Sequence, residues 1–549
     1  MKTFSVFTLS GKHTPFHEYR VGFHSRTGGF LTAGLLALIP TVSLAGGKNQ
    51  KTVTLEPLSS IAAHTPGVSA AEIVAHDPAT QRLFVVNAVA AQIEVFDIHN
   101  PASPFFVGAI DVTPYGAVAN SVAVNDGVVA IAVEASPKTA PGSVVFFDTG
   151  LHFLAAVKVG AQPDMLTFSP DGRYVVTANE GEPSDDYTVD PEGSVSIVDV
   201  SGGVGLVQQS DVRTAGFTAF NGMPLAPDIR VFGPGASAAQ DFEPEYLTIT
   251  PNSKTAYVTL QENNALATVD LKHGVVTGIS SLGTKNHLLP GNGLDAGDRD
   301  GVINIQPWPV SGFYLPDSIA SYKVGGDLFL VMANEGDSRA YTAFNEETRV
   351  NAANYVLDPV KFPNAAALKT NAQIGRLRVT NTSGDTDGDG DIDVINSFGA
   401  RSFSIRRPDG TLVWDSGDQL ERITAEEEPA FFNASNANNL FDDRSDDKGP
   451  EPEGIALGKA FGREYAFVGL ERIGGIMVFD ISNPSAPVFA DYVNNRDFTQ
   501  PTTVAASGDL GPEGLIFISA SDSPTNTPLI VAGNEISGTT TLYELKKSK

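Results

Sequence analysis

The sequence contains no cysteine, and this absence excludes several kinds of protein. Without a thiol there is no disulfide framework, no cysteine nucleophile, no thiolate zinc site and no lipid-anchored cysteine. Basic residues are also scarce, with 36 Lys and Arg against 64 Asp and Glu, for a formal net charge of −28. A surface this acidic repels nucleic acid and anionic membranes, so we expect neither as a partner. Divalent cations are the counter-ions that we expect instead.

The chain also has little hydrophobic sequence of membrane-spanning length. Several basic residues precede the apolar run 30–39, which is too short for the roughly 20 residues that a transmembrane helix needs. Small residues at 43 and 45 follow this run, as they do at a signal-peptide cleavage site. We therefore predict that residues 1–45 are a signal peptide. The mature protein is expected to be exported, periplasmic or extracellular, soluble and not inserted in a membrane.

What the chain does contain is a repeat. One pattern occurs seven times. It starts with a Pro/acid segment, which is followed by a short apolar strand and a turn. A second strand then ends in Asn, Glu or Gly, and a third strand often ends in Asp. The repeats begin at residues 71, 120, 163, 244, 316, 452 and 512. Runs of four to six β-branched and aromatic residues between turns indicate β-strands, and sustained helical periodicity is missing.

Seven units of four short antiparallel strands predict an all-β fold, a seven-bladed β-propeller. An unpaired apolar strand at 52–55 is expected to pair with the last strand, 541–545, and so to close the ring and remove exposed edges. The propeller would be a single domain over 46–549. Loops are inserted at about 212–240, 284–311, 341–396 and 421–449. Two β-sandwich domains are the competing interpretation.

Acidic residues recur at two places in the repeat. They begin the first strand and end the second strand, and in an antiparallel pair these two places share one end of the blade. The residues concerned are Glu72, Asp164, Glu245, Asp317, Glu453 and Glu513 in the first set, and Glu134, Glu180, Glu262, Glu335, Glu471 and Glu535 in the second. We expect these twelve carboxylates on one face, near the mouth of the central channel.

Twelve carboxylates that lie close together cannot all stay ionised without compensation, because each close pair repels by about 3 kcal/mol. Two interpretations remain open. The acids bond to loop amides and connect blades, or they hold hard divalent cations. Ca²⁺ is the expected cofactor because flexible loops suit its 6–8 oxygen ligands. A second divalent ion or a transition metal could accompany it.

A separate calcium motif lies in one insertion. Its acids follow the spacing D-x-D-x-D-G-x-I-x, with Asn396 in place of the usual final Glu. They are Asp385, Asp387, Asp389, Asp391 and Asp393. The flanking segments read as strands, so the motif predicts a structural calcium loop outside an EF-hand, with a solvated acidic turn as the alternative. The looser cluster 295–301 stays open between the same two interpretations.

Five basic residues adjoin the acidic motifs, namely Arg339, Arg401, Arg444, Lys448 and Arg472. Arginine binds carboxylates and phosphates equally well. These residues therefore either pair with internal acids or form, with a metal, a clamp on a phosphate. The second arrangement is what metal-assisted phosphoester hydrolysis requires.

Four segments, 334–341, 398–405, 448–454 and 533–539, resemble the choice-of-anchor I family. The resemblance covers roughly residues 52–546. It implies an exported bacterial propeller of YVTN/WD40-like form, some of whose relatives are labelled alkaline phosphatase and others a cell-surface glycoprotein.

Two functional hypotheses follow. In the first, a calcium-dependent phosphoester hydrolase, Arg339, Arg444 and Arg472 hold phosphate, and the metal ligands are Glu180, Glu245, Asp317, Glu335, Glu453, Glu513 and Glu535. In the second, a non-catalytic, calcium-stiffened propeller uses its insertions to bind a glycan or a protein. The two differ in whether arginine heads converge with carboxylates on one open pocket or pair internally.

Overall fold

The computed structural model describes residues 52–62, 64, 66–67 and 70–548. The predicted signal peptide lies outside these residues, which belong to the unit Lys51–Lys549. No helix in the described part has both the length and the apolar character needed to cross a membrane.

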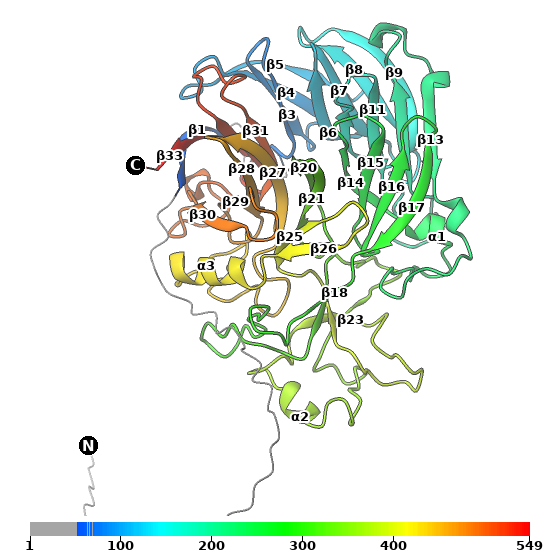
Figure 1. The fold of residues 1–549 in the computed structure, drawn as a ribbon, viewed down its shortest axis with the longest axis vertical. Helices are drawn as coiled ribbons and strands as arrows, with labels where there is room; N and C mark the ends of the chain where they lie inside the picture. The colour runs from blue at the N-terminus through cyan, green and yellow to red at the C-terminus, as the bar shows by residue number, and fades with distance from the viewer. Residues whose placement is uncertain (1–51, 63, 65, 68–69, 549) are drawn as a thin grey trace, which may run out of the picture. The chain divides into compact units, whose positions relative to one another are not determined.

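The described chain forms seven four-stranded antiparallel sheets and one five-stranded sheet (Figure 1). The first four are built from β2 (Val74–Asp77), β3 (Arg82–Asn87), β4 (Gln92–Asp97) and β5 (Phe105–Asp111); β6 (Val118–Asn125), β7 (Val128–Glu134), β8 (Pro141–Asp148) and β9 (Phe153–Ala161); β10 (Pro163–Phe168), β11 (Tyr174–Asn179), β12 (Ser194–Asp199) and β13 (Val212–Gly216); and β14 (Pro244–Ile249), β15 (Thr255–Leu260), β16 (Ala265–Asp270) and β17 (Val275–Ser281).

The remaining three four-stranded sheets complete the ring. They consist of β20 (Ile319–Val324), β21 (Asp327–Asn334), β25 (Ser402–Arg406) and β26 (Leu412–Asp415); β27 (Pro452–Ala460), β28 (Arg463–Leu470), β29 (Ile476–Asp480) and β30 (Val488–Val493); and β31 (Pro512–Ile518), β32 (Leu529–Asn534), β33 (Thr539–Lys547) and β1 (Val53–Ala62). The first strands of the seven sheets contact one another in the cyclic order β2, β6, β10, β14, β20, β27, β31 and back to β2. The predicted all-β propeller is therefore confirmed.

The ring closes through the N-terminal strand. β1 pairs antiparallel with β33, with Leu55 opposite Leu545 and Val53 opposite Lys547. The last sheet thus receives its fourth strand from the opposite end of the described chain, as predicted. This pairing joins segments that are far apart in the sequence and makes β1 the outer strand of the last sheet.

The core lies between neighbouring sheets. Seven clusters of buried apolar side chains each join two adjacent sheets around the ring. In β11, for example, Val175 packs toward β6–β9 and Val176 toward β14–β17. Alternate residues of a strand point to opposite faces, so a strand buried on both faces must be apolar throughout. This explains the continuous apolar runs of the repeat.

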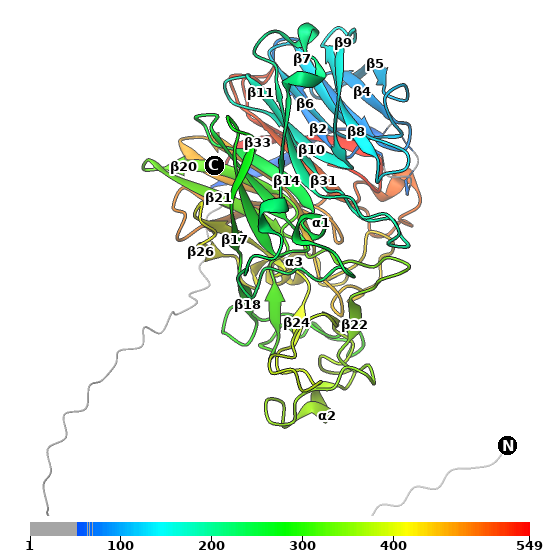
Figure 2. The same ribbon diagram turned by 90° about the vertical axis from the view of Figure 1, so that its right-hand side faces the viewer.

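The insertions contribute the five-stranded sheet and three short helices. The sheet contains β18 (Thr284–Asn286), β19 (Ser311–Phe313), β24 (Asn396–Ser397), β23 (Arg378–Thr380) and β22 (Glu347–Arg349), and the helices are α1 (Ala238–Asp241), α2 (Ala365–Leu368) and α3 (Gln419–Glu427). Single 3₁₀ turns cover Val204–Leu206, Gln209–Asp211, Thr218–Phe220 and Ala505–Ser507. Figure 2 shows β22, β24 and α2 together at one end of the propeller. The insertion predicted to start at 212 starts after Gly216, because β13 belongs to the third sheet.

Candidate functional site: an acidic pocket

The acids of the first set are placed by irregular strand starts. In β10, β14, β27 and β31, the pairing register shifts just after the first proline, between residues 163 and 166, 244 and 247, 452 and 455, and 512 and 515. A bulge of this kind redirects the side chain within it. The residue that follows each proline, and so lies in the irregularity, is Asp164, Glu245, Glu453 or Glu513.

A glycine next to one of these acids permits close approach of neighbouring first strands. A Cβ on Gly454 would lie 1.9 Å from the carbonyl oxygen of Glu513. No side chain fits at that distance, so the Pro-Glu-Gly start of β27 lets β31 approach closely. The acids of adjacent sheets are brought together as a result.

The acids of the second set lie at or just beyond the ends of the second strands. Glu134 is the last residue of β7, Glu262 lies two residues after β15, and the others follow directly on their strands, namely Glu180, Glu335, Glu471 and Glu535. The backbone N–H of Glu180 donates to the carbonyl oxygen of Gln162 at 3.0 Å, and that of Glu535 donates to Gly511 at 2.8 Å. Each of these acceptors precedes the proline of its own first strand. The two sets of carboxylates therefore meet at one end of the ring, as the repeat pattern predicts.

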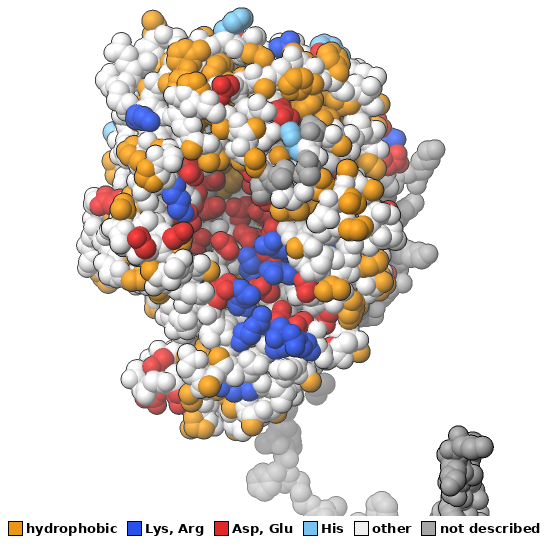
Figure 3. All heavy atoms as spheres, turned by 180° about the vertical axis from the view of Figure 1, so that it is seen from behind, with side chains coloured by type: hydrophobic (Ala, Val, Ile, Leu, Met, Phe, Trp, Pro, Cys, Tyr) orange, Lys and Arg blue, Asp and Glu red, His pale blue; other side chains and the backbone are white. Residues whose placement is uncertain are grey.

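A pocket of about 270 Å³, here called the acidic pocket, lies among these residues. Eight carboxylates line it: Asp164, Glu245, Asp317, Glu335, Asp337, Glu453, Glu471 and Glu513. Among its described lining residues, Arg472 is the single Lys or Arg. Figure 3 shows acidic side chains gathered in a hollow on this side of the molecule, with Lys and Arg side chains beside them. Glu180 and Glu535 do not line the pocket.

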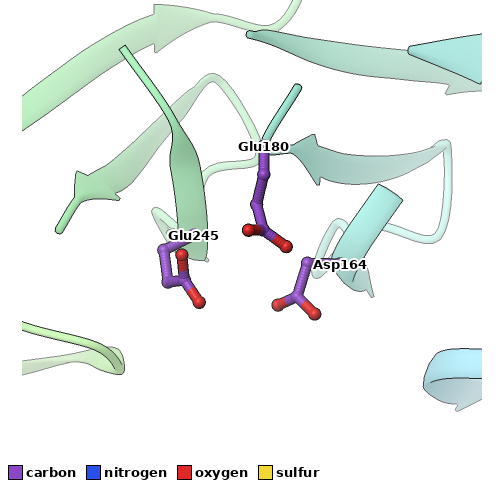
Figure 4. A group of neighbouring side chains, drawn as sticks. All are labelled: Asp164, Glu180 and Glu245. Atoms are coloured by element: carbon purple, nitrogen blue, oxygen red, sulfur yellow. The ribbon is translucent and has the colours of Figure 1, made fainter. Parts of the chain in front are cut away.

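Three carboxylates, Asp164, Glu180 and Glu245, form what we call the open acidic group (Figure 4). Each offers an oxygen within 4.8 Å of those of the other two. Gln162 donates to Glu180 at 2.9 Å, but within the described residues no Lys, Arg or His forms an ion pair with any member. Nearby, the Oε2 atom of the buried Glu262 has no hydrogen-bond partner.

Burial and mutual repulsion disfavour the ionised form of the open acidic group. Burial, together with the charges of Glu182 and Glu134, raises the pKa of Asp164 to about 7. Burial also raises the pKa of Glu180 well above its usual range, with Glu182 and Asp164 adding to the shift. Burial and the neighbouring Glu180 likewise raise the pKa of Glu245 well above its usual range. Without a cation, these carboxyls therefore hold protons near neutral pH.

Glu335, Glu451 and Glu471 form a second cluster within the same distance limit, here called the paired acidic group. Here the protein supplies its own cations. Lys448 Nζ lies 2.7 Å from Glu335 and 3.2 Å from Glu451, and Arg472 lies 2.8 Å from Glu451 and 2.7 Å from Glu471.

Arg444 completes the neutralisation of the paired acidic group through Nε, which donates to Glu451 at 3.0 Å. Burial alone would raise the pKa of Glu451, but Lys448, Arg444 and Arg472 hold that pKa far below its usual range. Glu451 is thus an ionised, fully buried acid at the centre of three cations.

The other two basic residues singled out from the sequence lie away from the acidic pocket. Arg339 is buried and pairs with Asp241 and Glu243, the latter at 3.0 Å. Arg401 is buried too, and it donates to Glu421 at 2.7 Å and to the carbonyl oxygens of Asp295, Ser445 and Asp447. Of the five predicted cations, only Arg472 is among the described residues that line the pocket. All five, Arg472 included, form ion pairs with internal carboxylates.

The loop 385–393 brings its acids into two overlapping groups. Asp385, Asp387 and Asp393 lie within 4.8 Å of one another, and so do Asp358, Asp391 and Asp393. Asp389 is in neither group; it accepts from the backbone N–H of Asp391 at 3.1 Å. The flanking elements are the strands β23 and β24, as expected for a loop outside an EF-hand. Asp358 was not anticipated, because it lies 27 residues before the motif.

Sequence reasoning also missed Glu451 and Glu243. Both precede the proline of a first strand, in the triplets Glu243-Pro244-Glu245 and Glu451-Pro452-Glu453. In each triplet, the second Glu faces the shared face of the blades and the first pairs with a cation, Arg339 or Lys448. The repeated Glu-Pro-Glu was the signal that could have found them.

Among proteins of known sequence, the chain is 29% identical over 285 residues to the mesenchyme-specific cell surface glycoprotein of Strongylocentrotus purpuratus, which covers 46% of this chain and 36% of that protein. It is 29% identical over 192 residues to Gigasin-3a of Magallana gigas, covering 33% of this chain and 67% of the other. The chain thus spans about a third of the length of the first relative.

Solved structures with a similar course of the chain include Kuenenia stuttgartiensis hydrazine synthase and streptogramin B lyase. Hydrazine synthase has a TM-score of 0.44 at 14% identity, covering 87% of this chain and 97% of the other. Streptogramin B lyase has a TM-score of 0.44 at 9% identity, covering 90% and 97%. The model of the choice-of-anchor I domain matches residues 72–484, which is most of the ring. The chain therefore belongs to the choice-of-anchor I domain family.

Proposed function

We propose that this protein is an exported propeller that binds Ca²⁺ in the acidic pocket and uses the bound ion to hold an anionic ligand. The observation that supports this proposal is the charge imbalance of the pocket, which has eight carboxylates and one arginine among its described lining residues. An anionic ligand would be repelled from such a wall unless a cation lay between them. Hard oxygen donors of this kind suit Ca²⁺.

The open acidic group would hold the ion. Asp164, Glu180 and Glu245 already offer oxygens within 4.8 Å of one another. The unpartnered Oε2 atom of Glu262 is a further candidate ligand. Metal ligands must be deprotonated, so binding would displace the protons that these buried carboxyls otherwise keep. The bound ion would supply positive charge that polarises or orients an oxyanion.

A second Ca²⁺ is proposed for the loop 385–393. There Asp393 belongs to two overlapping carboxylate groups, one with Asp385 and Asp387 and one with Asp358 and Asp391. Location outside the cytoplasm is part of the same proposal. It rests on the signal-like segment before residue 46 and on the family, one of whose relatives is named a cell surface glycoprotein.

Isothermal titration of the metal-free mature protein with Ca²⁺ tests this proposal, and metal analysis of the purified protein shows whether a transition metal is also present. Replacing the open acidic group by D164N/E180Q/E245Q should remove one binding event. The matched control E335Q/E471Q, which alters the paired acidic group, should retain it. Equal binding by the two variants would contradict the assignment.

Metal-dependent phosphoester hydrolysis is the second candidate function. It is favoured by the position of Arg472 on the pocket wall, where it shares the carboxylate of Glu451 with Lys448 and Arg444. In this role Arg472 would orient a phosphate oxygen, while Arg339 and Arg401, held by internal acceptors, would not touch the substrate.

Turnover of p-nitrophenyl phosphate from about pH 6 to 10, with Ca²⁺ and then with chelator, tests this candidate. Activity that needs Ca²⁺ and falls in Arg472→Met would support it. If no turnover occurs at any pH while Ca²⁺ still binds, the catalytic candidate fails and the binding proposal stands.

A further inference from the structure

The acidic pocket continues into a second cavity along the axis of the ring. This cavity of about 360 Å³, here called the channel chamber, is lined mainly by residues 74–76, 122–124, 166–167 and 516–518. These segments lie on the first strands of the first, second, third and last sheets, and the first strands surround the axis. Four residues line both cavities and form what we call the waist, namely Ile73, Ser121, Met165 and Tyr246.

The order of residues along the first strands places the two cavities end to end. On β10, Asp164 lines the acidic pocket, Met165 lines both cavities and Thr167 lines the channel chamber. On β31, Glu513 lines the pocket and residues 516–518 line the chamber. Both strands begin at the acidic end of the ring. An acidic zone, the waist and the chamber therefore follow one another along the axis.

The channel chamber differs from the acidic pocket in its side chains. Most of those that line it are apolar, and the described lining residues include no Lys, Arg or Glu. Its His76 and Asp522 lie near or beyond the far ends of β2 and β31, away from the acids. At the waist, Ile73, Met165 and Tyr246 are only half-buried. Apolar side-chain surface therefore faces the channel directly below the acids.

We propose that the anionic ligand of the acidic pocket is an amphiphile, with an oxyanion head on the bound Ca²⁺ and an alkyl chain that passes the waist into the channel chamber. This inference rests on the proposed function, because the head needs the cation. Ligand sites combine apolar walls with a few polar groups that fix orientation, and here the two lie in sequence along one axis. An alkyl chain in the chamber would remove its apolar surface from water, whereas a small hydrophilic anion would leave the chamber unused.

Binding of two phosphonates to the mature protein tests whether an alkyl chain contributes. Hexylphosphonate and ethylphosphonate carry the same head, which phosphoester hydrolysis cannot remove, and they differ only in chain length. Each CH₂ group that becomes fully buried adds about fourfold to the affinity. In saturating Ca²⁺, calorimetric titration should therefore show hexylphosphonate binding about tenfold or more tightly than ethylphosphonate. Chelator should abolish the binding of both.

Two substitutions that narrow the channel chamber give a second measurement. Thr167→Phe and Ala123→Leu enlarge half-buried side chains of the chamber wall, on the neighbouring strands β10 and β6, and neither residue lines the acidic pocket. Each should lower the affinity for hexylphosphonate about tenfold while Ca²⁺ and ethylphosphonate still bind as in wild type, which also shows that the variant is folded. Thr277→Phe, at an exposed position of the outer strand β17, is the matched control and should bind all three as wild type does.

The outcomes separate this inference from the proposed function. Equal affinities for the two phosphonates, with binding still dependent on Ca²⁺, would overturn the inference and leave the proposed function in place. Unchanged hexylphosphonate affinity in both Thr167→Phe and Ala123→Leu would do the same. If neither phosphonate binds in Ca²⁺, both proposals fail. Hexylammonium that binds in chelator more tightly than hexylphosphonate does in Ca²⁺ would also overturn the inference, because the acids would then hold a cationic head directly.

Discussion

The open and paired acidic groups lie at the same end of the ring, and each contributes two carboxylates to the wall of the acidic pocket. They differ in how their charge is balanced. The paired acidic group receives Lys448, Arg444 and Arg472 from nearby segments. In the described part of the chain, no Lys, Arg or His pairs with the open acidic group, and the amide of Gln162 donates to Glu180. One propeller thus contains both solutions to the same electrostatic problem. The difference shows which carboxylates are already neutralised by Lys and Arg side chains and which need a cation from solution.

The largest effect should come from removing the centre of the paired acidic group. Glu451→Ala leaves the buried Lys448 and the partly buried Arg444 and Arg472 without their shared anion. Breaking a buried ion pair in this way costs about 3–5 kcal/mol of the free energy of unfolding. Chemical denaturation measures the loss. Glu56→Ala, which removes an exposed pair with Lys546, serves as control and should change nothing measurable. A loss below about 1 kcal/mol in Glu451→Ala would mean that the pairs are not a stabilising unit.

Next in size is the pH dependence of the metal-free protein. Burial and neighbouring acids raise the pKa of Glu72 from 4.5 to about 8, and burial raises that of Glu471 to about 8. The folded state therefore binds more protons than the unfolded state between these values, so stability falls as the pH rises from about 4.5 to 8. We expect a loss of about 3 kcal/mol across this window in chelator. Saturating Ca²⁺ should reduce it, and a pH-independent stability in chelator would contradict the account.

A smaller effect of opposite sign is expected in the open acidic group. Glu180→Gln removes a buried charge that lacks a counter-ion, so in chelator at pH 8 it should raise the free energy of unfolding by about 1 kcal/mol. The same variant should lose part of the stabilisation that Ca²⁺ gives to wild type. Destabilisation in chelator, as in Glu451→Ala, would erase the distinction between the two groups.

The smallest effect is expected when the paired acidic group is made to resemble the open acidic group by removal of one cation. Lys448→Met takes from the paired acidic group the cation that bridges Glu335 and Glu451. Divalent affinity should then appear or rise there, in calorimetric titration of a D164N/E180Q/E245Q background, by about tenfold. If Lys448→Met binds no better than this background, the paired acidic group is unsuited to a metal for reasons other than its own lysine.

The sequence predicted the ring and the meeting of the acids because both depend on short-range patterns. The residues of each repeat predict its strands and turns. The position of Asp164 or Glu180 within its repeat determines the end of the blade at which that residue lies. The pairing of β1 with β33 followed from an apolar strand without a neighbour at each end of the ring.

The pairing of charges could not be predicted in the same way. Arg339 binds Asp241, which is 98 residues away, and Arg230 binds Glu346 across 116 residues. The five-stranded sheet likewise joins pieces of two or three residues, with β19 parallel to β24. Such contacts depend on how insertions fold back on the ring, and no local spacing encodes them.

The most direct test of the central claim is an anomalous diffraction map of crystals grown from the mature protein and soaked with Mn²⁺ or Tb³⁺ at about pH 8. The account predicts a peak bonded to oxygens of Asp164, Glu180 and Glu245, at about 2.2–2.6 Å. It predicts no peak among Glu335, Glu451 and Glu471, where Lys448 and two arginines already lie. A vacant open acidic group, or an ion bound in the paired acidic group instead, would contradict it.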